Sequence, residues 1–87
     1  MAVDQNMRCI GIISDTHGKL KPDIHRIFSN VDHIIHTGDI GTFDILNELE
    51  CIAPVSAVFG NTDRSPLRDQ LKAVVILKAA NYQILVT

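Results

Sequence analysis

Three short apolar runs, each followed by a polar signature that contains glycine, constrain this chain more than any other feature. The runs are residues 9–13, 33–36 and 55–59. The signatures are Asp15-Thr16-His17-Gly18, Gly38-Asp39-Ile40-Gly41 and Gly60-Asn61-Thr62-Asp63. A run rich in β-branched residues followed by glycine and a polar residue is typical of a strand that ends in a tight loop. We therefore expect three strands, with the polar residues at their ends.

The segments between these runs favour helices. Pro22 suits the first turn of one helix, and apolar residues follow it at helical spacing. Phe43–Glu50 carries an apolar stripe, with Thr42 as the candidate N-cap. The β-α-β-α-β order predicts an α/β fold with parallel strands and right-handed crossovers. The strands are expected at about residues 7–14, 33–37 and 55–59.

The last third of the chain has a different pattern. Residues 64–72 are charged and include a proline, which predicts a loop with at most one helical turn. Two strand-like runs follow, at residues 73–77 and 82–86, and their spacing predicts a β-hairpin. We expect all of residues 1–87 to belong to one domain.

Composition excludes several classes of function. The 87 residues have a formal charge of −2 and a pI near 6.0, which argues against a strong nucleic-acid footprint. No apolar run approaches the ~20 residues of a membrane span, and the N-terminus does not resemble a signal peptide. Cys9 and Cys51 lack the spacing of a zinc or redox pair, so we expect buried thiols in a reducing cytoplasm.

The polar signatures contain residue types that bind divalent metals. Asp15 and His17 are two positions apart, so in an extended segment their side chains point the same way and can share an ion. Asp39 has two oxygens and can bridge two ions, and Asn61 offers an amide oxygen. Taken singly, each has a structural alternative, because Asp after a strand is often a cap and Asn often a turn residue. The three signatures together favour a two-metal site for attack on phosphorus.

These residues resemble the motifs of the calcineurin-like metallophosphoesterase superfamily, whose pattern is D-x-H, then G-D, then G-N-H-[DE], then later histidines. The branch with the greatest similarity is the YfcE-type phosphodiesterases. The resemblance implies the N-terminal half of an α-β-β-α sandwich and two divalent ions, which are Mn, Ni, Zn or Fe. It implies metal ligation by Asp15, His17, Asp39 and Asn61, with Asp39 as the bridge.

The chain departs from the family pattern in two places. Thr62 stands where the family has a histidine after the asparagine, and its hydroxyl can donate a hydrogen bond but cannot act as an acid near neutral pH. Asp63 is then interpreted as a residue that either supports the metal ligands without binding metal or fixes the loop. The family's later His-Gly-His and Gly-His-x-His segments have no counterpart, so we expect the 87 residues to hold only part of the dinuclear site.

The other histidines do not replace those segments. We expect His25 to be exposed on the first helix, His33 to lie at the surface at the start of a strand, and His36 to be a core or hydrogen-bonded residue.

The resemblance implies an enzyme that hydrolyses phosphodiesters by attack of metal-bound hydroxide, with Asp39, Asn61 and Thr62 as the catalytic residues. We expect little turnover from the 87 residues alone. The alternative is a non-catalytic protein-interaction scaffold of the same fold, as in the retromer subunit. The expected partners are a phosphoester substrate and a second copy of the chain, bound through an uncovered apolar sheet face.

Overall fold

The computed structural model describes residues 9–65, 67–73, 75–79 and 82–86. This part of the chain contains five strands and three helices, which alternate up to the hairpin formed by the last two strands. In order they are β1 (Ile10–Ile13), α1 (Asp23–Ile27), β2 (His33–His36), α2 (Phe43–Glu50), β3 (Val55–Ala57), α3 (Leu67–Gln70), β4 (Val75–Ala79) and β5 (Tyr82–Val86).

The first three strands form a parallel sheet in the order β1-β2-β3. Gly11 pairs with Ile34, and Ile34 in turn pairs with Val55, so the strands are in close register. All three strands therefore finish at one edge of the sheet, where the loops after β1, β2 and β3 begin. The predicted α/β fold with parallel strands is confirmed.

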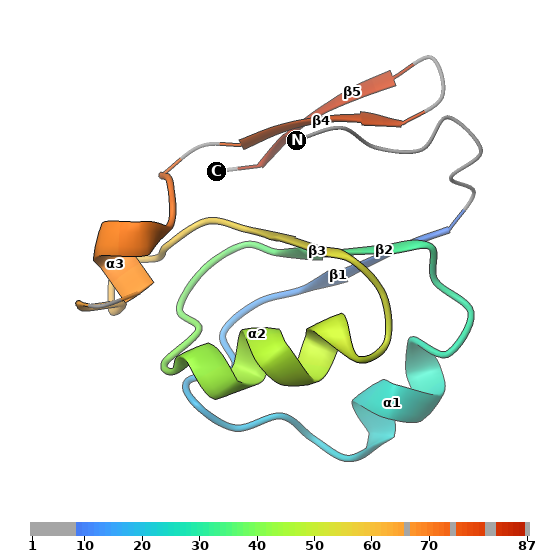
Figure 1. Cartoon of the computed structure of the whole chain (residues 1–87), viewed down its shortest axis with the longest axis horizontal. Helices are drawn as coiled ribbons and strands as arrows, with labels where there is room; N and C mark the ends of the chain where they lie inside the picture. The colour runs from blue at the N-terminus through green and yellow to red at the C-terminus, as the bar shows by residue number, and fades with distance from the viewer. Residues whose placement is uncertain (1–8, 66, 74, 80–81, 87) are drawn as a thin grey trace.

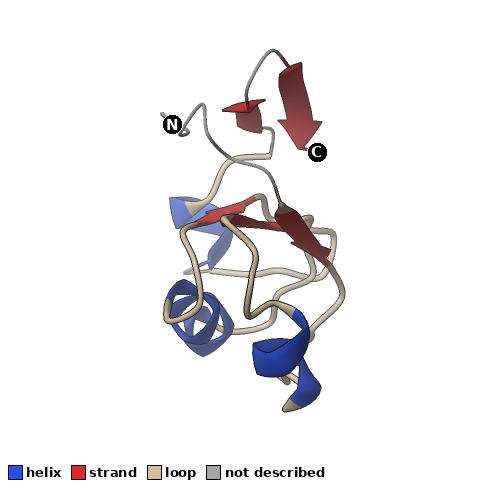
Figure 2. Cartoon of the chain, turned by 90° about the vertical axis from the view of Figure 1, so that its right-hand side faces the viewer, coloured by secondary structure: helices blue, strands red, loops and turns tan. Residues whose placement is uncertain are grey.

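Helices α1 and α2 cover one face of this sheet, and the hairpin formed by β4 and β5 lies on the other side (Figures 1 and 2). A core of eight buried side chains fills the helical side: Phe28, Ile34, Ile40, Ile45, Leu46, Leu49, Ala53 and Leu67. A β-carbon at Gly11 would lie only 2.9 Å from the Phe28 ring, so β1 and the end of α1 are in close contact. This packing fixes the end of α1 against β1.

The secondary structure follows the sequence predictions closely. Helix α2 has the predicted bounds, with Thr42 at the N-cap position, although its side chain makes no capping hydrogen bond. The predicted hairpin is present, with β4 antiparallel to β5. The strands of the sheet are shorter than predicted within the described residues, and β1 ends at Ile13, two residues before Asp15 takes a positive φ of 56°. The expected helical turn in residues 64–72 is α3.

Two expectations about burial are wrong. His33 is 3% exposed instead of lying at the surface, and its Nε2 lies 2.8 Å from Ser56 Oγ on the neighbouring strand. Cys9 and Cys51 are exposed instead of buried. Cys9 lies just before β1, and Cys51 follows the last residue of α2, so neither reaches the core.

None of the helices in the described part of the chain has the length and apolar character needed to cross a lipid bilayer.

Candidate metal centre

The loops after β1 and β2 run side by side and are joined by backbone hydrogen bonds. Three amide groups of the first loop donate to three consecutive carbonyl oxygens of the second. The pairs are Asp15 to Gly38 at 3.1 Å, His17 to Asp39 at 3.0 Å and Gly18 to Ile40 at 2.7 Å. The sheet is thus extended beyond its strands by a short ladder, and this ladder places the two signatures against each other.

Three non-glycine residues in these loops have left-handed backbone conformations. The φ angles are 56° for Asp15, 50° for His17 and 56° for Asp39. Such conformations cost about 1–3 kcal/mol each and persist only where the surroundings enforce them. All three residues are candidate metal ligands. The strain is therefore concentrated at the residues that the sequence singles out.

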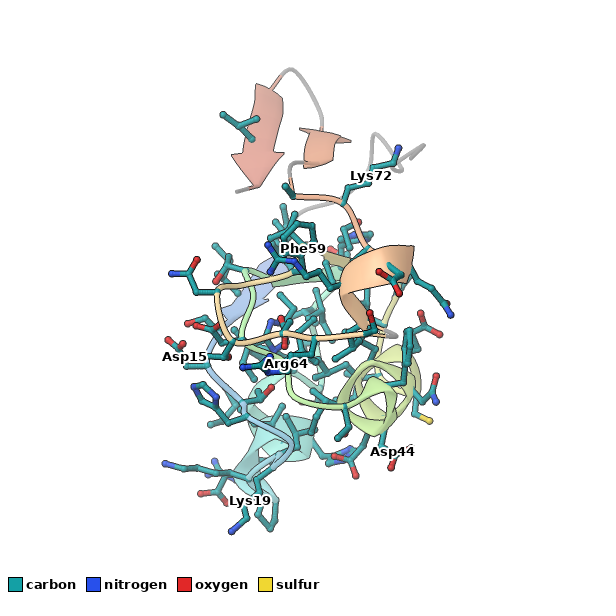
Figure 3. All side chains as sticks on the ribbon, turned by 90° about the vertical axis from the view of Figure 1, so that its left-hand side faces the viewer. Asp15, Lys19, Asp44, Phe59, Arg64 and Lys72 are labelled. Atoms are coloured by element: carbon teal, nitrogen blue, oxygen red, sulfur yellow. The ribbon has the colours of Figure 1, made fainter. Side chains whose placement is uncertain are left out.

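The same three side chains converge. One ligand atom from each of Asp15, His17 and Asp39 can be chosen so that all three atoms lie within 4.8 Å of one another. His17 Nε2 lies 3.7 Å from Asp15 Oδ1, and both side chains are exposed. Figure 3 shows Asp15 at the outer edge of its loop, away from the packed interior. Two carboxylates and an imidazole open to solvent are a donor set that fits a divalent transition metal.

Asp39 is held by Thr62. One carboxylate oxygen, Oδ1, accepts hydrogen bonds from the Thr62 amide at 2.9 Å and from its hydroxyl at 2.8 Å. These bonds, first from the Thr62 backbone and then from its side chain, lower the pKa of the Asp39 carboxyl below its usual value. Asp39 is consequently ionised near neutral pH, as a metal ligand must be.

Asn61 lies beside this cluster. It is exposed, and together with Asp39, Thr37 and Phe59 it lines a cavity of about 350 Å³. The structure therefore brings Asp15, His17 and Asp39 into one group, and Asn61 lines the same cavity as Asp39.

Asp63 fixes the third loop, which is one of the two roles considered for it from the sequence. It is 2% exposed, and its Oδ1 accepts the amides of Ile40 at 2.8 Å and Gly41 at 3.0 Å. Its Oδ2 accepts the amide of Gly60 at 2.8 Å. A single carboxylate thus ties the loop after β3 to the loop after β2.

His36 is buried and hydrogen-bonded, which confirms the expectation for this residue, and His25 is exposed, as expected. Burial lowers the pKa of His36, while the nearby carboxylates of Asp63, Asp15 and Asp39 act in the opposite direction. The ring is therefore neutral near pH 7.

Sequence reasoning missed two residues that support the loops. Thr16 lies between Asp15 and His17, and its hydroxyl reaches inward to His36 and to the Ile40 carbonyl. The available signal was its place between two candidate ligands, since the alternation of an extended strand does not apply where Asp15 and His17 have positive φ angles. The other is Arg68, whose guanidinium lies 4.3 Å from the centre of the Phe59 ring, next to the loop after β3.

The sequence matches a family model described as the calcineurin-like phosphoesterase superfamily domain over residues 7–87. It is 45% identical over 60 residues to a probable metallophosphoesterase of Methanothermobacter thermautotrophicus, and this match covers 63% of the chain and 35% of the relative. It is 40% identical over 73 residues to a phosphodiesterase of Methanocaldococcus jannaschii, covering 75% and 43%. The chain spans less than half the length of these curated relatives.

Two solved structures share the fold. Vps29 of Chaetomium thermophilum superposes with a TM-score of 0.74 at 15% identity, covering 87% of this chain and 43% of that one. A single mutant of Vps29 from Entamoeba histolytica gives 0.72 at 19% identity, covering 90% and 46%. The parallel sheet and its helices match the N-terminal part of that fold.

Proposed function

Because the chain belongs to the calcineurin-like phosphoesterase superfamily, we propose that it forms part of a metal-dependent enzyme that hydrolyses phosphodiesters. The convergence of Asp15, His17 and Asp39 at one sheet edge carries this proposal. We also propose that the enzyme belongs to the YfcE-type branch and acts in the cytoplasm. The name of the Methanocaldococcus relative, a phosphodiesterase, supports the substrate class.

The roles proposed for the residues are those that the family resemblance implies, and the positions of the residues support them. Asp15 and His17 would hold one ion, Asp39 would bridge to a second, and Asn61, which lines the same cavity as Asp39, would contribute its amide oxygen to that second ion. Mn, Ni, Zn or Fe fits this mixture of carboxylate, imidazole and amide donors. Two bound ions would supply a water of lowered pKa and neutralise charge on the phosphoryl group.

Thr62 has a narrower role than the histidine that the family has at this position. Its hydroxyl is already donated to Asp39 Oδ1, and its amide is donated to the same oxygen. Thr62 therefore orients the bridging carboxylate and keeps it ionised. It is not available as an acid for the leaving group, so substrates whose leaving group needs little protonation are favoured.

The alternative is a non-catalytic scaffold of the same fold, and the two Vps29 structures are the observation in its favour. A likeness at 15–19% identity concerns the fold alone. The metal-ligating residue types present at all four positions favour the enzyme instead. A measurement of metal binding distinguishes the enzyme from the scaffold, because a scaffold does not need a bound metal.

Metal titration of the 87-residue chain tests the proposal. We expect calorimetry to detect weak Mn²⁺ binding by the parent chain. Asp39→Ala should weaken this binding by more than ~10–100-fold, which is the loss typical of removing a residue that hydrogen-bonds to a metal ligand. The matched control is Asp69→Ala, which removes another exposed carboxylate with a hydroxyl partner, Ser65. Loss of Mn²⁺ binding in both variants, or in neither, would contradict the assignment.

Hydrolysis of an aryl phosphodiester tests the reaction itself. We expect little turnover from the 87 residues and clear Mn²⁺-dependent turnover from a chain extended by the family's histidine segments. In the extended chain, Asp39→Ala should lower turnover more than Thr62→Ala, because Asp39 binds metal and Thr62 only orients Asp39. Equal losses would mean that the two roles are wrongly assigned.

We further propose self-association through apolar surface. Ile12 on β1 is 66% exposed and Leu85 on β5 is 63% exposed. Sedimentation velocity should show a dimer that Ile12→Lys weakens, and a monomer at all concentrations would refute this.

A further inference from the structure

His36 lies directly beneath the two loops that carry Asp15, His17 and Asp39. It is fully buried at the end of β2. Its Nδ1 accepts a hydrogen bond from the Gly38 amide at 3.1 Å. In a neutral ring the proton must then be on Nε2, which lies 2.9 Å from Thr16 Oγ1 and donates to it.

Thr16 continues this chain of hydrogen bonds. With its oxygen accepting from His36, its hydroxyl proton is donated to the Ile40 carbonyl at 2.9 Å. The series Gly38 amide, His36 ring, Thr16 hydroxyl and Ile40 carbonyl begins and ends in the loop after β2, and Thr16 alone belongs to the loop after β1. Every donor and acceptor in it has one defined direction, so the two loops are held in one relative position.

We infer that His36 and Thr16 are positioning residues for the metal centre, and that their hydrogen bonds set the separation between Asp15 and His17 on one loop and Asp39 on the other. This inference rests on the proposed function. Both ring nitrogens of His36 are engaged, so His36 is not itself a ligand.

The backbone conformation of the ligands explains why such support is needed. All three have a positive φ, and in a free loop each would relax to a negative one. The backbone ladder between the loops opposes this, but its amides lie at the solvent-facing edge, where Asp15, His17 and Gly18 are all exposed. Thr16 anchors the middle of the strained segment from the buried side.

His33 is a natural control. It lies on the same strand as His36, is 3% exposed, and is bonded to Ser56 on β3, 2.8 Å away. It lies on the opposite face of β2 from His36, toward the hairpin, and Ser56 belongs to the sheet and not to the metal-binding loops. Loss of either imidazole therefore removes a buried hydrogen-bonded ring, but only one of them touches the loop after β1.

The test compares Thr16→Val, Thr16→Ser, His36→Gln and His33→Gln in the 87-residue chain. Valine has the shape of threonine without its hydroxyl, while serine keeps the hydroxyl. Three quantities are measured: the dissociation constant for Mn²⁺, the hydrogen exchange of the Asp15, His17 and Gly18 amides, and the urea midpoint.

We expect Thr16→Val and His36→Gln to weaken Mn²⁺ binding roughly tenfold, as outer partners of metal ligands do, and to accelerate exchange of the three amides. Thr16→Ser should stay within about twofold of the parent. His33→Gln should lower the urea midpoint as much as His36→Gln while leaving Mn²⁺ affinity unchanged, which a merely structural role for His36 would not produce.

Unchanged Mn²⁺ affinity in Thr16→Val, or an equal loss in His33→Gln, would overturn the inference. If the parent chain binds no Mn²⁺, the proposed metal function fails, and the exchange rates decide the inference separately. In that case, faster exchange of the three amides in Thr16→Val supports the positioning role, and unchanged exchange overturns it.

Discussion

The strand-end loops of this protein have a buried layer and an exposed layer that are built from the same residue types. The buried layer is His36 and Asp63, and it has a hydrogen-bond partner at every polar side-chain atom that the structure describes. The exposed layer is Asp15, His17, Asp39 and Asn61, which face solvent or the open cavity. The carboxylate and the imidazole of the buried layer hold the loops together, while the side chains of the other layer keep donor atoms accessible and are the candidate metal ligands.

The largest loss of stability is expected where the loop after β1 contacts the loop after β2. Gly41 has a φ of 97°, and a β-carbon there would collide with the backbone of Gly18. Gly41→Ala should therefore lower the free energy of unfolding by ~3 kcal/mol or more. Gly18→Ala is the control, because its β-carbon would meet only Thr42 Cγ2 at 3.7 Å and only the cost of its positive φ, ~1–2 kcal/mol, applies. Urea melts measure both, and equal losses would show that the loops can separate freely.

Exchanging one carboxylate for an amide in each layer sharpens the comparison. Asp63→Asn puts an NH₂ group against backbone amides that now donate to oxygen, and should cost ~2–3 kcal/mol of stability. Asp15→Asn changes an exposed side chain and should stay within ~0.5 kcal/mol, yet lose Mn²⁺ affinity. Urea melts and calorimetry on both variants check this. A stable Asp63→Asn variant would mean that Asp63 does not hold the loops.

The pH dependence of stability should report the buried histidines. Burial lowers the pKa values of His33 and His36 below the ordinary 6.5, so the folded rings stay neutral while the unfolded chain takes up protons. The free energy of unfolding should consequently fall as pH drops below about 6.5, by up to about 1.4 kcal/mol per pH unit for each histidine. The lowered pKa of Asp39 acts in a separate window, below 3.8.

Urea melts between pH 7.5 and 5 measure this slope. His33→Gln and His36→Gln should each make it shallower. A slope that neither variant changes would mean that these rings are already protonated in the folded protein.

The smallest effect is expected at Thr62. Thr62→Val removes the hydroxyl donor to Asp39 but leaves the amide donor in place. Mn²⁺ affinity should fall by less than about tenfold, since one of two hydrogen bonds to that oxygen remains. Calorimetry decides this, and a loss as large as that in Asp39→Ala would make Thr62 part of the ligand set.

Much of this architecture could be predicted from local patterns. The bounds of α2, the parallel order of β1 to β3 and the hairpin all follow from hydrophobic periodicity and turn residues. The four candidate ligands and the loop-fixing role of Asp63 follow from their places after the strands. Each of these features depends on residues that are near neighbours in sequence or on the rule that parallel strands end at one edge.

The burial of individual side chains and the hydrogen bonds between loops depend on contacts between segments that are distant in the sequence. His33 is buried because Ser56, 23 residues away, lies beside it on β3, and the cysteines are exposed because neither β1 nor α2 carries them to the core. The link from His36 to Thr16 crosses 20 residues and joins an inward-facing side chain to the neighbouring loop. The sequence alone determined which residues are candidate metal ligands, since that depends on residue type and place along the chain. Tertiary structure decided which partners hold them there, since hydrogen bonds between loops exist only once the strands have paired.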